Sequence, residues 1–294
     1  MSAIEDFLNY LKADRGYSLQ TVRSYSDSLL SFEIFFRSLD AQLTWERIDV
    51  DVIRRWMSVE AERCKTSRTI CKELSALRSF YKYLLRTKRI EKNPMRLVSN
   101  PKMTVPLPTF LKQSEIDELF DQVIFPDTNE GLRDRTILLL FYHTGIRVSE
   151  LVGLNRSAIN LMQRELKVTG KRNKQRIVPF GEELENALNV YLLRRDELEA
   201  FDPEALFLNA KSKRISVAQV RRVVHQYLAL VTTQKKKSPH VLRHTFATAM
   251  LNNGADLEAI REILGHESID TTEVYTHTTF ADLKKEYERA HPRA

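Results

Sequence analysis

Hydrophobic residues recur at every third or fourth position through the first ninety residues of the chain. This spacing places apolar side chains on one face of an α-helix, as it does for Val22, Tyr25 and Leu29. The segments with this pattern are 4–16, 18–39, 50–64 and 67–90. They predict four helices that each bury one face, and therefore an all-α first domain.

The helical pattern stops near residue 94, where prolines become frequent. Proline removes a backbone donor and pushes the residue before it out of helical geometry. The prolines are Pro94, Pro101, Pro106 and Pro108. They predict an extended linker over 94–108, between a helical domain of residues 1–93 and a second domain of residues 109–294.

The second domain returns to helical spacing, with one interruption. Helices are predicted over 112–124, 131–145 and from 146 onward, and Gly145 ends the second of them. The segment 165–180 alternates apolar and polar residues around a polar tip, which predicts a β-hairpin. The fold class is therefore mainly α: an all-α N-terminal domain plus an α-rich domain with a small antiparallel β-sheet.

Composition limits where the protein works. Hydrophobic residues make up 43% of the chain and charged residues 29%, so a core can form. The sequence contains no run of eighteen apolar residues, so no membrane-spanning helix is predicted. The N-terminus lacks the pattern of a signal peptide. The two cysteines, Cys64 and Cys71, are two helical turns apart, too far for a disulfide and too few for a zinc site. We expect a cytoplasmic protein without a metal site.

Positive charge is clustered along the chain. The net charge is +7, and the segment 63–96 holds eleven Lys and Arg against two acids, Glu73 and Glu91. Further basic clusters occupy 170–176 and 210–222. A cluster can be a merely solvated helix face, but three together indicate a polyanionic partner. Arg68, Lys72 and Arg78 lie opposite the apolar stripe of 67–90, which suits a DNA backbone.

A phosphate site is indicated at "SPHVLRHTFATAMLNNG", residues 238–254. Ser238 and Pro239 suit the start of a helix, which places His240 in the first turn with Arg243 on the same face. The free N–H groups of a helix start favour an anion. The spacing alone also arises by chance.

Four further residues are candidates for a catalytic site. Arg147 follows Gly145 where a helix begins, and Lys171 lies at the mouth of the predicted hairpin. Taken alone, the first could be a buried structural arginine and the second an exposed lysine. His266 follows a helix stop at Gly265, and Tyr275 comes nine positions later.

The order of these residues resembles the tyrosine site-specific recombinases, the integrase family, and within it the Xer-type branch. The motifs that carry the likeness are "LSALRSFYKYL", "HTGIRVSELVGL", "PHVLRHTFAT", "LGHESIDTTEVYTH" and the closing "HPRA". The likeness covers nearly the whole chain. It implies a SAM-like core-binding domain followed by a catalytic domain.

The resemblance also implies a mechanism. Tyr275 would attack the scissile phosphate of double-stranded DNA and form a 3′-phosphotyrosyl link. Arg147 and Arg243 would hold the non-bridging oxygens, since guanidinium is always charged and binds in a fork. The covalent link conserves bond energy, so no nucleotide cofactor is expected.

The remaining catalytic roles concern protons. By the same resemblance, Lys171 would protonate the leaving 5′-oxygen, His240 would accept the tyrosine proton, and His266 would donate a hydrogen bond to the phosphate. The arginines and the lysine take the place of a cation, so no metal is expected.

The hairpin departs from the usual family pattern, Gly-Lys-Gly-Asn-Lys-Glu-Arg. Arg172 and Gln175 replace the second Gly and the Glu, so a left-handed turn position would fall to Asn173. The general acid could be Lys171 or Lys174, and the pattern favours Lys171. The residues on this hairpin that we expect to contact DNA are Lys174 and Arg176.

The C-terminal segment 278–294 has Phe280, Leu283 and Tyr287 at helical spacing. It could pack on its own domain or dock onto a neighbouring protomer, and the resemblance favours the neighbour. The partners it implies are a homo- or hetero-tetramer, formed with itself or a paralogous recombinase, and a septal DNA translocase.

Three functions fit to different degrees. The Xer-type likeness favours chromosome dimer resolution at cell division. An integrase of a mobile element would share the same chemistry. A non-catalytic helix-turn-helix regulator fits segment 245–275, but it would not need the full catalytic set.

Overall fold

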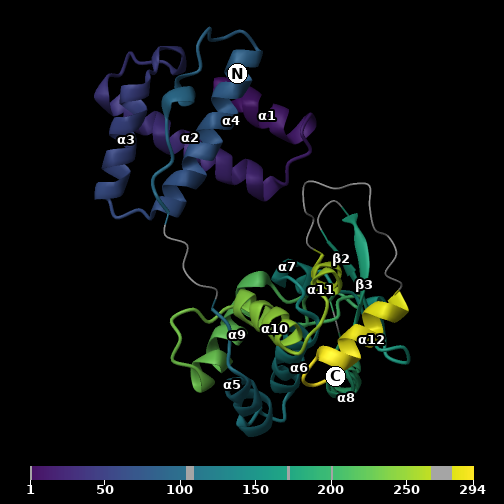
Figure 1. The fold of residues 1–294 in the computed structure, drawn as a ribbon. Coiled ribbons are helices and arrows are strands. Elements are labelled where there is room, and N and C mark those ends of the chain that lie inside the picture. The colour runs from purple at the N-terminus through teal and green to yellow at the C-terminus, as the bar shows by residue number, and fades with distance from the viewer. Residues whose placement is uncertain (1, 104–108, 171–172, 200, 266–279) are drawn as a thin grey trace. The chain divides into compact units, whose positions relative to one another are not determined.

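The computed structural model describes residues 2–103, 109–170, 173–199, 201–265 and 280–294. The chain forms two compact units, Met1–Pro106 and Leu107–Ala294, called here the first and second units (Figure 1). The division falls inside the predicted linker. Within the described residues, no helix is both long and apolar enough to cross a membrane.

The first unit contains the four predicted helices. They are α1 (Ala3–Ala13), α2 (Leu19–Leu39), α3 (Val50–Glu62) and α4 (Ser67–Arg86), with a short 3₁₀ helix η1 (Trp45–Arg47) before α3. Each α-helix begins after a residue whose side-chain oxygen accepts a first-turn N–H bond, namely Ser2, Ser18, Asp49 and Thr66. The prediction of an all-α first domain is confirmed.

Aromatic rings form the centre of the first unit. Phe32 lies edge-on to Trp56, with ring centroids 5.3 Å apart, and Trp45 lies edge-on to Phe80 at 4.7 Å. The Tyr81 hydroxyl donates to the Trp45 carbonyl at 3.2 Å. These contacts join η1, α2, α3 and α4 into one core.

The first residues of the predicted linker are not extended. Pro94–Leu97 forms a 3₁₀ helix, η2, and Met95 and Val98 are buried in the core of the first unit. Arg78 fixes this segment from α4 by donating to the Val98 carbonyl at 3.0 Å and to Asn100 Oδ1 at 2.8 Å. The prolines were therefore misleading here, because apolar side chains between them find partners in the preceding core.

The second unit is helical around a small sheet. Its helices are α5 (Gln113–Asp117), the π-helical turn η3 (Glu118–Gln122), α6 (Asn129–Thr144), α7 (Val148–Val152), the 3₁₀ turn η4 (Arg156–Ala158), α8 (Glu182–Asp196), α9 (Val217–Val231), α10 (Pro239–Asn252), α11 (Leu257–Leu264) and α12 (Phe280–Ala290). The sheet is antiparallel, in the order β1 (Ile159–Asn160), β2 (Glu165–Thr169) and β3 (Gln175–Pro179). Leu166 pairs with Val178, and both face the core. The predicted hairpin and fold class are confirmed.

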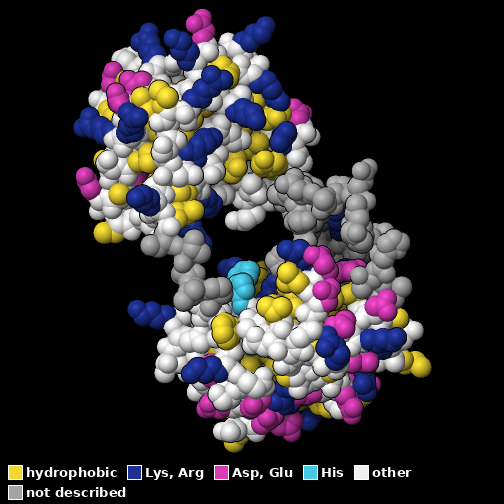
Figure 2. Space-filling view, in the orientation of Figure 1, with side chains coloured by type: hydrophobic (Ala, Val, Ile, Leu, Met, Phe, Trp, Pro, Cys, Tyr) yellow, Lys and Arg dark blue, Asp and Glu magenta, His cyan; other side chains and the backbone are white. Residues whose placement is uncertain are grey.

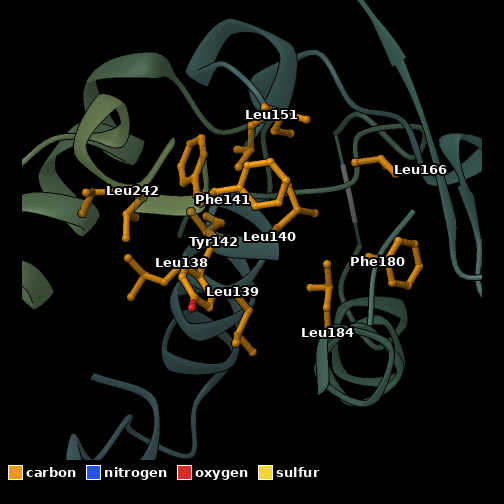
Figure 3. Packing of buried hydrophobic residues seen from close by; sticks show 14 of the residues in the cluster. Leu138, Leu139, Leu140, Phe141, Tyr142, Leu151, Leu166, Phe180, Leu184 and Leu242 are labelled. Carbon is orange, nitrogen blue, oxygen red and sulfur yellow. The ribbon is translucent and has the colours of Figure 1, made fainter. Parts of the chain in front are cut away.

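Helix α6 runs through the centre of the second unit. Its residues from Thr136 to Thr144 are all buried, and Figure 3 shows Leu138 to Tyr142 packed among side chains from α7, α8, α10 and the sheet. A helix that is apolar on every side needs such cover. The end of α6 is thereby held in place, and the next residues are the first of the candidate site.

The C-terminal helix α12 packs on its own unit, against β3, α10 and α11. Leu283, Tyr287 and Ala290 are buried there. The structure thus shows the first of the two predicted placements, packing on the helix's own domain, and docking onto a neighbouring protomer stays a prediction. A buried polar cluster holds the helix there: the Tyr287 hydroxyl lies 3.0 Å from Nδ1 of His143, and the His291 ring stacks on both.

Candidate active site

The helix predicted to bind phosphate begins where the sequence indicates. Ser238 is the N-cap of α10 and Pro239 its first residue. His240 lies in the first turn and is exposed, whereas Arg243, one turn on, is buried at 7% exposure. The start of α10 therefore presents a histidine in its first turn, with a buried arginine one turn behind it.

A tight turn brings Arg147 to the same place. Gly145 follows α6 in the left-handed region, with φ at 57°, and its N–H bonds to the Phe141 carbonyl. A Cβ on this glycine would lie 2.6 Å from atoms of both Phe246 and Leu264. Only glycine fits this turn, after which Arg147 becomes the N-cap of α7.

Three arginines converge on the end of α11. The carbonyl groups there would otherwise lack partners and carry the partial negative charge of the helix dipole. Each accepts a bond from a different arginine: Ile263 from Arg176 Nε at 2.7 Å, Leu264 from Arg243 Nη2 at 2.9 Å, and Gly265 from Arg147 Nη2 at 3.0 Å. This end of α11 is thus the point where β3, α10 and the start of α7 meet.

A single buried carboxylate, that of Glu150, lies between two of these arginines. Its Oε1 accepts from Nη1 of both Arg147 and Arg176, at 2.9 and 3.0 Å. Its Oε2 accepts from the Arg147 N–H at 2.8 Å and from Arg176 Nη2 at 2.9 Å. Burial opposes ionisation, but these bonds outweigh it and hold the pKa of Glu150 below its ordinary value.

The two groups on α10 have altered acidity. Burial, together with the nearby charge of Arg147, lowers the pKa of Arg243 to about 10, so this guanidinium remains charged at neutral pH. Partial desolvation and the charge of Arg243 lower the pKa of His240. His240 is therefore neutral at pH 7 and able to accept a proton.

Three of the predicted catalytic residues, Lys171, His266 and Tyr275, lie outside the described residues. The turn of the hairpin is described from Asn173 onward, and Asn173 has φ at 61° as predicted. The Gly170 N–H bonds to the Lys174 carbonyl at 2.7 Å and closes this turn.

The residues predicted to contact DNA fall into two groups. Arg68, Lys72 and Lys174 are exposed. Arg78 is instead bound to the segment after η2, and the Arg176 side chain is 14% exposed and paired with Glu150. Figure 2 shows Lys and Arg side chains spread over the visible face of the first unit.

Sequence reasoning missed Glu150. Its signal was local: it lies three residues after Arg147, the spacing of a capping box, and its side chain does accept the Arg147 N–H. Together the cluster holds three guanidinium groups and one carboxylate, an excess of positive charge beside a helix start. Such a site binds an oxyanion such as a phosphodiester. Among the described residues, no group of three or more His, Cys, Asp or Glu could hold a metal ion.

Comparison with known proteins identifies the family of this chain. The model of the phage integrase family matches residues 109–282, and that of the phage integrase N-terminal SAM-like domain matches residues 4–88. The chain therefore belongs to the phage integrase family and is a tyrosine recombinase, an enzyme that cleaves and rejoins DNA.

Among its relatives are proteins named tyrosine recombinase XerC. The one from Thermodesulfovibrio yellowstonii is 40% identical, over 98% of this chain and 96% of that protein. The one from Bacillus subtilis is 37% identical, over 98% and 95%.

Solved structures share the fold. The XerA recombinase is 29% identical over 99% of both chains, with a TM-score of 0.50. The XerH recombinase bound to its difH substrate after cleavage is 22% identical, over 96% of this chain and 83% of that one, with a TM-score of 0.72.

Proposed function

We propose that this protein is a site-specific recombinase that cuts and rejoins double-stranded DNA through a 3′-phosphotyrosyl intermediate, with Tyr275 as the nucleophile. The observation that carries the proposal is the arginine cluster at the end of α11. It gathers Arg147 and Arg243 beside the start of α10, and α11 leads directly into the segment that contains His266 and Tyr275.

The residues divide the chemistry as follows. The Tyr275 oxygen bonds to phosphorus while the bond from phosphorus to the 5′-oxygen breaks. Arg147 and Arg243 bind the non-bridging oxygens, whose negative charge grows in the transition state. Their donors come from two separate elements, so the phosphate is held from two sides.

Proton transfers complete the step. Neutral His240 accepts the proton of Tyr275, and its lowered pKa suits that role at neutral pH. Lys171 protonates the leaving 5′-oxygen, and His266 donates to the phosphate. The reverse sequence, with a different 5′-hydroxyl as the attacking group, rejoins the strands.

Contacts with DNA beyond the site involve both units. We assign phosphate contacts to the exposed Arg68 and Lys72 of α4 and to Lys174 of the hairpin. We assign DNA-core binding to a domain of residues 1–93 and catalysis to a domain of residues 109–294. The two family models, which match 4–88 and 109–282, support this assignment. The packed residues 94–98 belong with the first domain.

The biological role follows from the relatives. Proteins named XerC match nearly the whole chain at 36–40% identity. We infer a role in resolving chromosome dimers at cell division, in the cytoplasm, within a tetramer formed with itself or a paralogous recombinase. A septal DNA translocase would activate the complex.

The test is a trapping assay on full-length protein. Nicked duplexes tiled across the replication-terminus region of the host chromosome are incubated with the protein in EDTA and without ATP. We expect an SDS-resistant protein–DNA adduct, attached at a 3′ end, that Tyr275→Phe abolishes. An adduct that survives in Tyr275→Phe would refute the nucleophile. Adducts formed only with the ends of a mobile element would favour the integrase alternative over chromosome dimer resolution.

A further inference from the structure

We propose that Arg176 is not a DNA contact but a positioning residue for Arg147, acting through the carboxylate of Glu150. The inference rests on the proposed role of Arg147 at the scissile phosphate. It replaces the sequence-based assignment of Arg176 to the DNA backbone.

The first argument is where the donors of Arg176 go. Nη1 and Nη2 form a fork on the two oxygens of Glu150, at 3.0 and 2.9 Å, and Nε donates to the Ile263 carbonyl at 2.7 Å. The side chain is 14% exposed. Residues that bind a DNA backbone are long, exposed cations, whereas this guanidinium is bonded along its whole width inside the protein.

The second argument concerns how many bonds a carboxylate can accept. Two oxygens offer about four lone-pair positions. At Glu150 two go to Arg176, one to the backbone N–H of Arg147 and one to its Nη1. Arg147 therefore reaches Glu150 with a single nitrogen of its guanidinium, and the Arg147 side chain remains 36% exposed.

Removal of Arg176 would take away two of the four hydrogen bonds that Glu150 accepts. The carboxylate would retain two unused acceptor positions in a buried site, which is costly unless another donor takes them. The guanidinium of Arg147 already donates to Glu150 through Nη1, and it would turn Nη2 from the Gly265 carbonyl onto one of these positions. An arginine bound in this way is withdrawn from the phosphate, although it remains present and charged.

The third argument is packing. Gly265 has φ at 64°, and a Cβ placed on it would lie 3.0 Å from Arg176 Nη1 and 3.2 Å from Cζ. The guanidinium thus lies directly beneath the residue that precedes His266. Arg176 fixes the end of α11 as well as Glu150, and a lysine, with one nitrogen, can do only one of these.

The test separates charge from fork geometry. Arg176→Lys keeps the charge and loses the fork, and Arg176→Gln loses both. On a nicked duplex that the wild-type protein cleaves, we expect both variants to form adduct roughly 10- to 100-fold more slowly at saturating DNA. DNA affinity and its salt dependence are measured in proteins that also carry Tyr275→Phe. Both should equal those of Tyr275→Phe alone.

A matched control is available in the same unit. Arg293 forms a similar fork on Glu183, at 2.6 and 2.9 Å, with a side chain 18% exposed, and contacts neither Glu150 nor α11 among its described bonds. Arg293→Lys should lose a comparable amount of thermal stability and cleave at the wild-type rate. Hydrogen exchange without DNA adds a measurement independent of activity, since Arg176→Lys should speed exchange in 147–154.

The outcomes are distinct. A normal rate for Arg176→Lys, with weaker binding and a smaller salt slope for Arg176→Gln, would restore the DNA-contact assignment. If Arg176 acts through Arg147, adding Arg176→Lys to Arg147→Lys slows cleavage no further, and independent multiplication of the two effects would overturn the inference. An unchanged rate in Arg147→Lys alone would instead refute the proposed function of Arg147.

Discussion

The last residue of the chain is packed against Gly181, and this contact makes a direct prediction for Gly181→Ala. Gly181 precedes α8 with φ at −87°, a conformation that alanine adopts readily. A Cβ there would lie 2.5 Å from the carbonyl carbon of Ala294 and 2.8 Å from the Arg293 oxygen. Since the backbone at residue 181 is unstrained, the cost of the substitution arises mainly from this overlap.

The magnitude follows from what must move. Overpacking of this kind costs about 1–3 kcal/mol, and it favours states in which residues 293–294 lift away and the fork from Arg293 to Glu183 breaks. We therefore expect the fraction of molecules with a detached C-terminus to rise roughly 5- to 150-fold.

Carboxypeptidase digestion followed by mass spectrometry measures that fraction. When opening is fast relative to cleavage, the rate at which residues 294 and 293 are lost reports the open population. Gly153→Ala is the control, because a Cβ there meets its nearest atoms at 3.4 and 3.5 Å, an ordinary contact. Equal digestion of Gly181→Ala and wild type would refute the docking of the C-terminus on its own unit.

Three further predictions concern the same unit. Gly145→Ala should destabilise the protein by about 2–4 kcal/mol in urea unfolding, because φ at 57° and contacts of 2.6 Å both oppose a Cβ; a loss below 1 kcal/mol would contradict this. Leu283→Asp should lower the melting temperature even for isolated molecules, since it buries a carboxylate in its own unit, and a purely assembly-dependent defect would argue for docking in trans. Burial raises the pKa of Glu183, but the nearby His143 ring, with Nε2 at 3.5 Å, and the hydrogen bonds from Arg293 outweigh burial and hold that pKa well below its ordinary value. The stability from Glu183 is thus complete above about pH 4.5 and lost as the pH falls further, so the difference in unfolding free energy between wild type and Glu183→Gln should shrink in acid.

Sequence patterns predicted those features of the fold that depend on residues close together in the chain. The helices of the first unit, the hairpin, and the start of α10 at Pro239 all follow from spacing and capping within a few residues. The placement of Asn173 in the left-handed region was likewise predictable, because it tolerates that conformation better than its neighbours.

Contacts between distant parts of the chain were not predictable in the same way. Arg176 was assigned to DNA because its exposure could not be read from alternation, and its partner Glu150 lies 26 residues away. Packing of the C-terminal helix on its own unit was not the favoured prediction, because the polar residues that hold it there, such as His143, lie inside an apolar run of α6. A pattern of apolar residues shows which face is buried and does not identify the surface that buries it.

The three carbonyl groups at the end of α11 have a consequence for how the enzyme meets its substrate. Without DNA, three neighbouring cations would repel one another and draw water around them. The carbonyl oxygens of Ile263, Leu264 and Gly265 each accept a hydrogen bond from one of these arginines and keep its guanidinium oriented. Under the proposed function, a phosphodiester would meet the guanidinium groups of Arg147 and Arg243 already oriented, so little solvent would have to reorganise when charge develops in the transition state.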